Sequence, residues 1–274
     1  MELVASARLR RAQERIVAMR PYADRMLELM AGTARASSSV RGLPLLQRCD
    51  VKTVAIVPVT GDRVLAVAFN TQILRRAIAL QRELRADGVQ TRWLPVGRKG
   101  ISTLRFSRFE LAAQWGGFSD NPAYADAQEI AHKLAELYTE EEEVDRVVLV
   151  YNHFVSALVQ QVTVQDVLPI SEEMLETSEE EREQDRLRGD FIFEPEPEEI
   201  LARLLPVYVE TEIYRALLES AASEQGARMS AMRNATKAAG ELIDSLTLSM
   251  NRARQAEITQ EILEVVACAD ALTG

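Results

Sequence analysis

The side chains able to do chemistry in this chain are few and scattered. There are two histidines, His132 and His153, and two cysteines, Cys49 and Cys268. The cysteines lie near opposite ends without CxxC or metal-ligand spacing, so we expect reduced thiols, as in a cytosolic compartment. His132 lies among Ala, Glu and Lys in a predicted helix, where a solvated histidine is expected. His153 follows a predicted strand, and the sequence indicates neither a base nor a nucleophile beside it.

Phosphate-binding patterns are missing from the sequence as well. It contains no GxxxxGK[ST] loop and no GxGxxG fingerprint. The Gly-Arg-Lys-Gly segment at 97–100 has the look of an anion site, but we interpret this short basic stretch as an exposed turn. Carboxylates occur in runs, at 140–143 and 172–185, which is typical of a solvated face. A small-molecule enzyme without a recognisable motif stays open as an alternative, because fold does not determine function.

Charge and composition narrow the class of protein. The net charge is −10, so the chain as a whole is not a nucleic-acid binder. Aromatic residues make up only 5%, which favours long packed helices over a compact all-β body. No apolar run reaches about 18 residues and the N-terminus is charged, so we expect neither a membrane span nor a signal peptide. Association with a membrane would then come only through partners.

The middle of the chain alternates β-rich and helical runs. We predict strands at 54–59, 91–96, 147–151, 158–168 and 191–193. We predict one helix from Asn70 or Thr71 to Asp87, stopped by Gly88, and another from Asn121-Pro122 to about Glu141. This alternation indicates a largely parallel sheet covered by helices.

Both ends of the chain carry apolar residues in steps of three and four, which indicates helices with one apolar face. The N-terminal stripe is Leu9, Ala12, Ile16, Met19, Ala23, Met26 and Met30, and the C-terminal stripe is Met229, Met232, Thr236, Ala239, Ile243, Leu246, Met250 and Ala253. A helix over 207–271 would be roughly 100 Å long and would need a partner helix. We expect the N-terminal helix to be that partner, with a kink or join at Pro21.

The predicted fold class is therefore α/β, with a long antiparallel coiled coil of N- and C-terminal helices and an inserted α/β, Rossmann-like domain. The expected division is residues 1–40 for the first helix, 49–193 for the α/β domain and 196–274 for the last helix.

The last third of the chain contains long, specific motifs. Residues 220–229 read SAASEQGARM, residues 231–236 read AMRNAT, and residues 251–259 read NRARQAEIT. Upstream segments fit the same pattern, among them DFIFEP at 190–195 and VLVYN at 148–152. Together these segments resemble the γ subunit of F-type ATP synthases over nearly the whole chain.

The resemblance implies a central-stalk rotor subunit that couples ion-driven rotation to ATP synthesis or hydrolysis at catalytic subunits. It implies no catalytic residue, cofactor or metal in this chain. The implied partners are the α and β subunits, the ε subunit and the membrane c-ring, on the cytoplasmic side of a bacterial plasma membrane. By position in the motif, Arg254 and Gln255, and with them Arg252, look like contacts with a partner subunit. Without the motif they would be ordinary solvated residues.

Several positions depart from the family. Val64 and Val67 stand where glycine is usual, and glycine there suggests a positive φ or a close backbone approach. Cys268 replaces a glycine, and the first helix begins several turns later than usual, at Met1. These departures support an alternative, a divergent coiled-coil adaptor that does not assemble in the synthase. The intact C-terminal motif argues against it.

Overall fold

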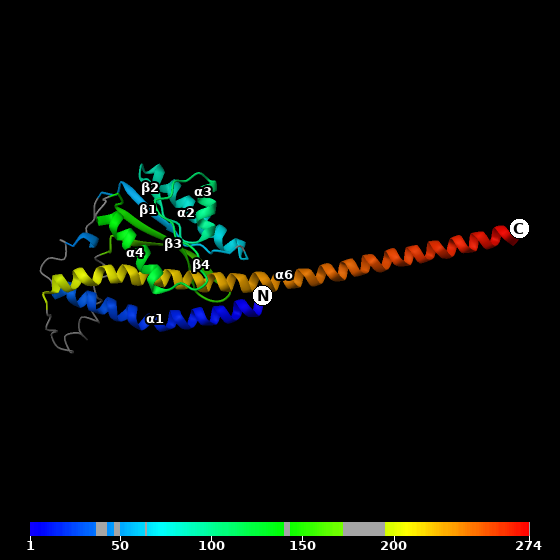
Figure 1. Cartoon of the computed structure of the whole chain (residues 1–274), viewed down its shortest axis with the longest axis horizontal. Helices are drawn as coiled ribbons and strands as arrows, with labels where there is room; N and C mark the ends of the chain where they lie inside the picture. The colour runs from blue at the N-terminus through cyan, green and yellow to red at the C-terminus, as the bar shows by residue number, and fades with distance from the viewer. Residues whose placement is uncertain (37–42, 47–49, 64, 140–142, 172–194, 274) are drawn as a thin grey trace.

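An α/β body lies against two long terminal helices in the computed structural model (Figure 1). The described residues are 1–36, 43–46, 50–63, 65–139, 143–171 and 195–273. Cys49, Val64, the predicted strand at 191–193 and nearly all of the acidic stretch fall outside these ranges. The mixed α/β fold with long terminal helices is the predicted class. The division of the chain into three domains stays a prediction.

The body is built on one sheet of four strands in the order β2-β1-β3-β4. The strands are β1 (Thr53–Pro58), β2 (Gln90–Trp93), β3 (Arg146–Phe154) and β4 (Gln160–Leu168). β1 pairs in parallel with β2 and β3, as the alternating pattern predicts. β4 is antiparallel to β3, because residues 155–159 form a connection too short for a parallel crossover.

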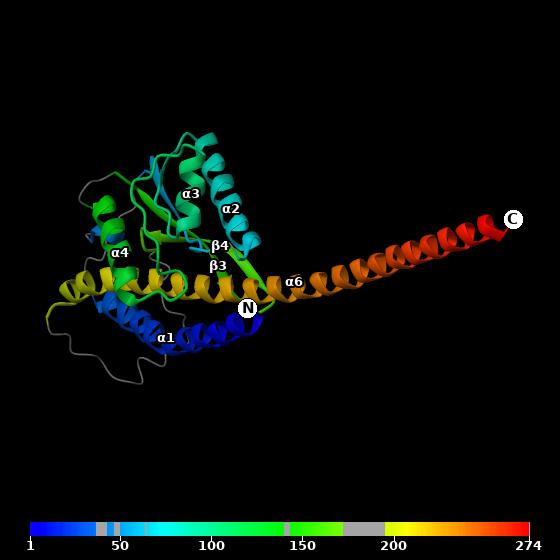
Figure 2. The ribbon, with the colours of Figure 1, turned by 45° about the vertical axis from the view of Figure 1, so that its right-hand side comes forward.

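Helices cover both faces of the sheet (Figure 2). The helices of the body are α2 (Val67–Ala86), α3 (Arg98–Phe106) and α4 (Tyr124–Thr139), with a 3-10 turn η2 (Pro44–Leu46). Val54 and Ile56 of β1 pack with α2 and α3, whereas Ala55 and Val57 pack with α4 and the last helix. This alternation gives the sheet a separate hydrophobic core on each face.

The start of α2 differs from the prediction. The helix begins at Val67, its N-cap is Ala66, and no side chain caps it. Asn70 lies inside the helix, where its Oδ1 accepts the N–H of Gly61 at 2.8 Å. Capping by Asn70 or Thr71 was therefore wrong, because the asparagine side chain is used to hold the loop after β1. Gly88 follows the helix with φ +80°, as expected of a stop signal.

The first helix, α1 (Glu2–Ala36), runs antiparallel to the first half of the last helix, α6 (Pro197–Thr273) (Figure 1). Every residue of the N-terminal stripe is buried or half-buried, and Met30 is 0% exposed. α1 continues through Pro21, whose side chain is exposed, and its ribbon bends in the middle (Figure 2). The contact between the helices reaches Glu2, whose Oε1 lies 2.9 Å from Nε of Arg233.

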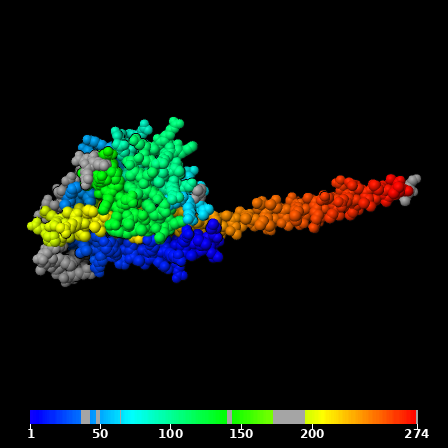
Figure 3. Space-filling view, viewed as in Figure 1, coloured from blue at the N-terminus to red at the C-terminus, as the bar shows by residue number. Residues whose placement is uncertain are grey.

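Beyond that point, the predicted pairing of the C-terminal stripe with α1 is wrong. Every residue from Arg233 to Leu272 except the half-buried Asn251 is exposed. We call residues 233–272 the distal shaft; it projects from the body as a bare rod (Figure 3). At 1.5 Å per residue it is about 60 Å long. The N-terminal stripe instead covers the part of α6 that precedes residues 229–253, because α1 begins beside Arg233.

The described helices include none that is both long enough and apolar enough to cross a membrane.

Candidate functional site

The three residues predicted to contact a partner subunit lie on the distal shaft. Arg252, Arg254 and Gln255 are all exposed. Two residues correspond to about 200° of helical rotation, so Arg252 and Arg254 point to nearly opposite sides of α6. Gln255 lies about 100° around the helix from Arg254 and about 60° from Arg252, because positions three apart are neighbours on a helix surface. On the helix, Gln255 therefore lies between the two arginines and nearer to Arg252, while the role of all three in subunit contact stays a prediction.

The distal shaft presents apolar side chains in more than one direction. Its exposed large hydrophobic residues are Leu242, Ile243, Leu246, Leu248, Met250, Ile258, Ile262, Leu263, Val265, Val266 and Leu272. Leu246 and Leu248 are two positions apart and therefore lie on nearly opposite sides of the helix. A helix that is apolar around its circumference is normally buried on all sides. This surface suits a partner that surrounds the helix better than a single partner helix.

The carboxyl ends of the parallel strands form the second candidate site, because open α/β sheets bind ligands there. The strand order places the switch point between β1 and β3. Here α6 fills it. Ser220 Oγ donates to the Val59 carbonyl at 3.4 Å, and Ser223 Oγ donates to the Asn152 carbonyl at 3.1 Å. A Cβ on Gly61 would lie 2.7 Å from Oε2 of Glu224. The space that a ligand would use in this fold is thus taken by the shaft helix.

The segment at 97–100 is the start of α3 and not the exposed turn that we predicted. Gly97 adopts φ +92°, and Gly100 is buried. The sequence did not indicate this helix, because its apolar content is low and its first turn is basic. Positive φ at Gly97 lets the backbone turn tightly after β2, and a Cβ there would lie 2.0 Å from the Thr60 carbonyl oxygen.

The anion-binding position at the start of α3 is occupied by a carboxylate of the chain itself. Asp62 Oδ1 accepts the Arg98 N–H at 2.9 Å, and Oδ2 accepts the N–H groups of Gly117 and Ser119 at 2.9 and 3.0 Å. Burial by itself would raise the pKa of Asp62. The backbone donors together lower the pKa by more than burial raises it, so the pKa lies below the usual value. The alternative of an external anion at 97–100 therefore has no support in the geometry.

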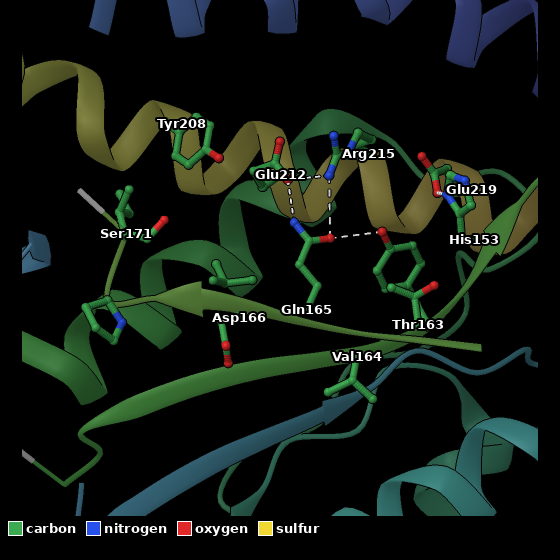
Figure 4. A pocket seen from close by; sticks show the side chains of 14 residues that line it. His153, Thr163, Val164, Gln165, Asp166, Ser171, Tyr208, Glu212, Arg215 and Glu219 are labelled. Atoms are coloured by element: carbon green, nitrogen blue, oxygen red, sulfur yellow. Dashed lines mark hydrogen bonds and ion pairs between the residues drawn. The ribbon is translucent and has the colours of Figure 1, made fainter. Parts of the chain in front are cut away.

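A polar cavity of about 640 Å³ lies between β4 and α6 (Figure 4). Gln165 is its central side chain. It donates to Glu212 at 2.7 Å and accepts from the Tyr151 hydroxyl at 2.9 Å, while Glu212 pairs with Arg215 at 2.7 Å. Burial, with smaller contributions from Glu219 and Glu212, raises the pKa of Tyr151 to about 12, so the hydroxyl stays a donor. These side chains bond one another and tie β3 and β4 to α6.

The two histidines are placed differently. His132 is 74% exposed, as the sequence predicts, with Glu210 Oε1 at 3.4 Å from its Nε2. His153 Nδ1 lies 2.5 Å from Glu219 Oε2, a partner that sequence reasoning missed. The two residues are 66 positions apart, and only the packing of β3 on α6 brings them together. In the described ranges, no group of three or more His, Cys, Asp or Glu side chains could hold a metal ion.

Comparisons with known proteins agree with this architecture. A family model described as ATP synthase matches residues 1–272. The ATP synthase gamma chain of Rubrobacter xylanophilus is 45% identical over 275 residues, which cover 100% of this chain and 92% of that one. The gamma chain of Nostoc punctiforme is 42% identical over 295 residues, which cover 100% and 93%.

Two solved structures have a similar fold. The central stalk and c-ring structure of the mitochondrial ATP synthase of Tetrahymena thermophila contains a chain with TM-score 0.61 and 27% identity; the match covers 86% of this chain and 97% of that one. A chain of the Euglena gracilis mitochondrial ATP synthase also has TM-score 0.61, at 16% identity over 97% and 95%, and shows the fold alone. The chain belongs to the ATP synthase family of the matching model and, within it, to the gamma chains.

Proposed function

We propose that this gamma chain is the central-stalk rotor of an F-type ATP synthase. It couples ion-driven rotation to ATP synthesis or hydrolysis at catalytic subunits and performs no catalysis itself. Its partners are the α and β subunits around the shaft, and the ε subunit and c-ring at the body. It is peripheral, on the cytoplasmic side of a bacterial plasma membrane, and is held there by these partners.

The observation that carries this proposal is the distal shaft. It projects about 60 Å from the body, and it has apolar side chains on opposite sides of one helix. Burying such a rod requires a partner with a central channel, which a ring of subunits provides. A similar chain belongs to a solved structure of the central stalk and c-ring of a mitochondrial ATP synthase.

A shaft can change the nucleotide affinity of its partners only by contacting them unequally. Each ring subunit must meet a different face of α6, and the free energy of that differential contact shifts its conformational equilibrium. The distal shaft supports this requirement, because Arg254 and Arg252 are both exposed and point to nearly opposite sides of it. We propose that Arg254 and Gln255 make a polar contact with a catalytic subunit, and that Arg252 contacts a different part of the ring.

The filled switch point argues against an enzyme on the α/β body. α6 occupies the crevice at the carboxyl ends of β1 and β3, and Asp62 occupies the anion position at the start of α3. A metabolite would have to displace both. The non-catalytic assignment rests on this packing together with the membership of the gamma-chain family.

Co-expression with α and β subunits from the same source tests the rotor function. The full chain should elute with them in a large complex during size exclusion, and ATP-driven ion pumping should require it. A chain ending at Met232 is the control, since residues 233–272 are exposed and their removal leaves the body packed. It should keep its circular dichroism melting transition and fail to enter the ring. A full chain that elutes alone beside competent ring subunits would overturn the proposal and favour the adaptor alternative.

A further inference from the structure

A group of charges with a buried pair, Glu224 and Arg228, lies where α1, α6 and two loops of the body meet. We call it the Asp120 cluster and define it as Asp120, Glu224, Arg228, Arg8 and Arg63. Asp120 is the centre: its Oδ1 lies 3.2 Å from Nη1 of Arg228, and its Oδ2 lies 3.0 Å from Nη1 of Arg8 and 3.5 Å from Nε of Arg63. The cluster therefore joins the shaft helix to the N-terminal helix and to the loops around the switch point.

Glu224 is the most deeply buried carboxylate of the cluster. Its side chain is 2% exposed, and that of its ion-pair partner Arg228 is 5% exposed. The glutamate carboxylate lies directly against Gly61, where a Cβ would lie 2.7 Å from Oε2 and would require the glutamate side chain to shift. An adjoining cavity of about 10 Å³ has room for at most one water molecule. A charge on Glu224 is thus stabilised almost entirely by protein groups.

The charged groups around Glu224 do not fully compensate a negative charge on its carboxylate. Arg228 approaches it from its own helix, Asp120 from the loop before α4, and Asp62 and Arg63 from the loop after β1. Arg228 is shared with Asp120, and Arg63 is 59% exposed, so its attraction is screened by solvent. Arg8 pairs with the other oxygen of Asp120 from a position that is 40% exposed. Among the described residues, Arg228 is the one guanidinium that pairs directly with Glu224, and it is shared with Asp120, so a charge on the glutamate is only partly compensated.

We propose that the Asp120 cluster is a proton-dependent latch that holds the α/β body and α1 on the shaft helix. The bound proton resides on Glu224. When it is bound, the buried interface carries one negative charge fewer and Arg228 is free to pair fully with Asp120. When it is lost, the interface has to bury a second carboxylate beside Asp120.

The direction of the pH dependence follows from the packing. Burial, with Asp120 and Asp62, raises the pKa of Glu224 to about 7, against the opposing effect of Arg228 and Arg63. In a detached, solvated state the pKa would be near the ordinary value of 4.5. The attached state therefore binds the proton more tightly, so its extra stability is complete below pH 4.5 and is lost as the pH rises through about 7. The latch is tighter in acid than in alkali.

The consequence for rotation rests on the proposed rotor function, since a loosened body would transmit less torque to the shaft. The latch itself does not depend on that function, because all of its groups belong to one chain. It can be measured in the isolated full chain.

Amide hydrogen exchange of the full chain at pH 6 and pH 8, corrected for the intrinsic chemical rate, tests the latch. The diagnostic peptides cover 59–63, 116–121 and 220–228. In the wild type, the opening equilibrium of these peptides should rise on the order of tenfold from pH 6 to pH 8. In Glu224→Gln, which mimics the protonated side chain, the rise should disappear. Glu212→Gln is the matched control, a buried acid on the same helix outside the cluster, and should keep the wild-type pH dependence.

Asp120→Asn is a second variant, in which the pH dependence should be shifted and not abolished. It removes a negative charge that raises the pKa of Glu224, so the pH at which protection is lost should move downward. A wild type without pH dependence in these peptides, or a Glu224→Gln chain that keeps it, would overturn the latch. A chain that shows the tenfold change but never enters the α–β ring would contradict the rotor function and leave the latch standing.

Discussion

Asp62 accepts backbone hydrogen bonds from three residues, Arg98, Gly117 and Ser119, at 2.9 to 3.0 Å. Those donors surround the start of α3, where a helix N-terminus attracts negative charge. In a nucleotide-binding α/β protein this is a place for a phosphate. Here the Asp62 carboxylate takes the place of that anion. Its hydrogen bonds join the loops after β1 and before α4 to α3.

Replacing Asp62 with Asn should therefore destabilise the body. The amide keeps one acceptor oxygen but turns an NH₂ group toward backbone donors, and the expected loss is about 1–3 kcal/mol of unfolding free energy at pH 7. Because the pKa of Asp62 is lowered in the folded chain, its contribution is present above about pH 4 and is lost as the pH falls through the folded value. Urea unfolding at pH 7 and pH 3 measures the loss of unfolding free energy and its dependence on pH. An equal difference between wild type and variant at both pH values would contradict this account.

Val67 gives a second test at the residue scale. The family usually has glycine there, but Val67 is the first helical residue of α2, and it is not among the described residues with positive φ. A positive φ, one of the two requirements that glycine suggests at this position, is therefore absent at Val67. Val67→Gly should lower the unfolding free energy, by up to about 1 kcal/mol, because glycine loses more backbone entropy in a helix.

The matched control for Val67 is Val67→Ala. Alanine removes the β-branched side chain, which is 61% exposed, while keeping the helical preference of the backbone. The alanine variant should melt at or above the wild-type temperature and the glycine variant below it. A glycine variant that melts at a higher temperature than the wild type and the alanine variant would show that glycine stabilises the chain at residue 67.

At the scale of elements, periodicity was sufficient for most of the fold. The strands at 54–59 and 147–151 were predictable because their apolar runs are continuous, as in a sheet covered on both faces. α3 was not, since its stability comes from Gly97 and from Asp62, which is distant in the sequence. The partner of the C-terminal stripe was also mispredicted, because a heptad pattern indicates that a helix needs a cover but not which residues provide it.

The candidate sites likewise include some that the sequence predicts and some that it does not. Arg254 and Gln255 could be singled out from a local motif, and the structure adds that both are exposed on the distal shaft. The Asp120 cluster and the pair of His153 with Glu219 could not be predicted. Glu224 and Arg228 are four residues apart on one helix, but the other members come from segments as distant as Arg8, and no local spacing relates them.

The two halves of α6 should respond differently to the same kind of substitution. Met30 of α1 is 0% exposed in the paired half, so Met30→Ala should cost about 2–4 kcal/mol of unfolding free energy. Ile243 lies on the distal shaft and is exposed, so Ile243→Ala should change the stability of the isolated chain by less than about 0.5 kcal/mol. Chemical denaturation of the two variants makes the comparison. A large loss for Ile243→Ala would mean that the distal shaft is covered within the isolated chain.

At the scale of the whole molecule, one part of the chain provides the packing that holds the molecule together, and another part is exposed for contact with partners. The body, α1 and the first half of α6 form one packed unit, held by the apolar seam, the network around Gln165 and the Asp120 cluster. Apart from Arg233, which pairs with Glu2, and the half-buried Asn251, the side chains of the distal shaft are exposed and lie outside that packing. Substitutions on the shaft should therefore alter work done on partners without altering the stability of the chain.

Arg254→Ala combined with Gln255→Ala tests that separation. Both side chains are exposed, so the melting temperature of the isolated variant should match the wild type. In the assembled complex, each lost polar contact should cost roughly 1 kcal/mol of differential binding, about fivefold in an equilibrium constant. Ions pumped per ATP hydrolysed should fall, because catalytic subunits would distinguish the faces of the shaft less well. Pumping assays in vesicles, with ATP turnover measured in parallel, give that ratio.

Lys237→Ala separates a specific contact from a general effect of charge on the shaft. Lys237 is exposed on the same helix, and its ion pair with Glu241 is long, at 3.9 Å, so its loss should leave stability unchanged. If the pumping ratio falls for the Arg254 and Gln255 variant and not for Lys237→Ala, coupling depends on those two side chains. An equal fall in both would indicate that the ring senses only the total charge of the shaft. Unchanged turnover and pumping in the double variant would remove Arg254 and Gln255 from the coupling contact.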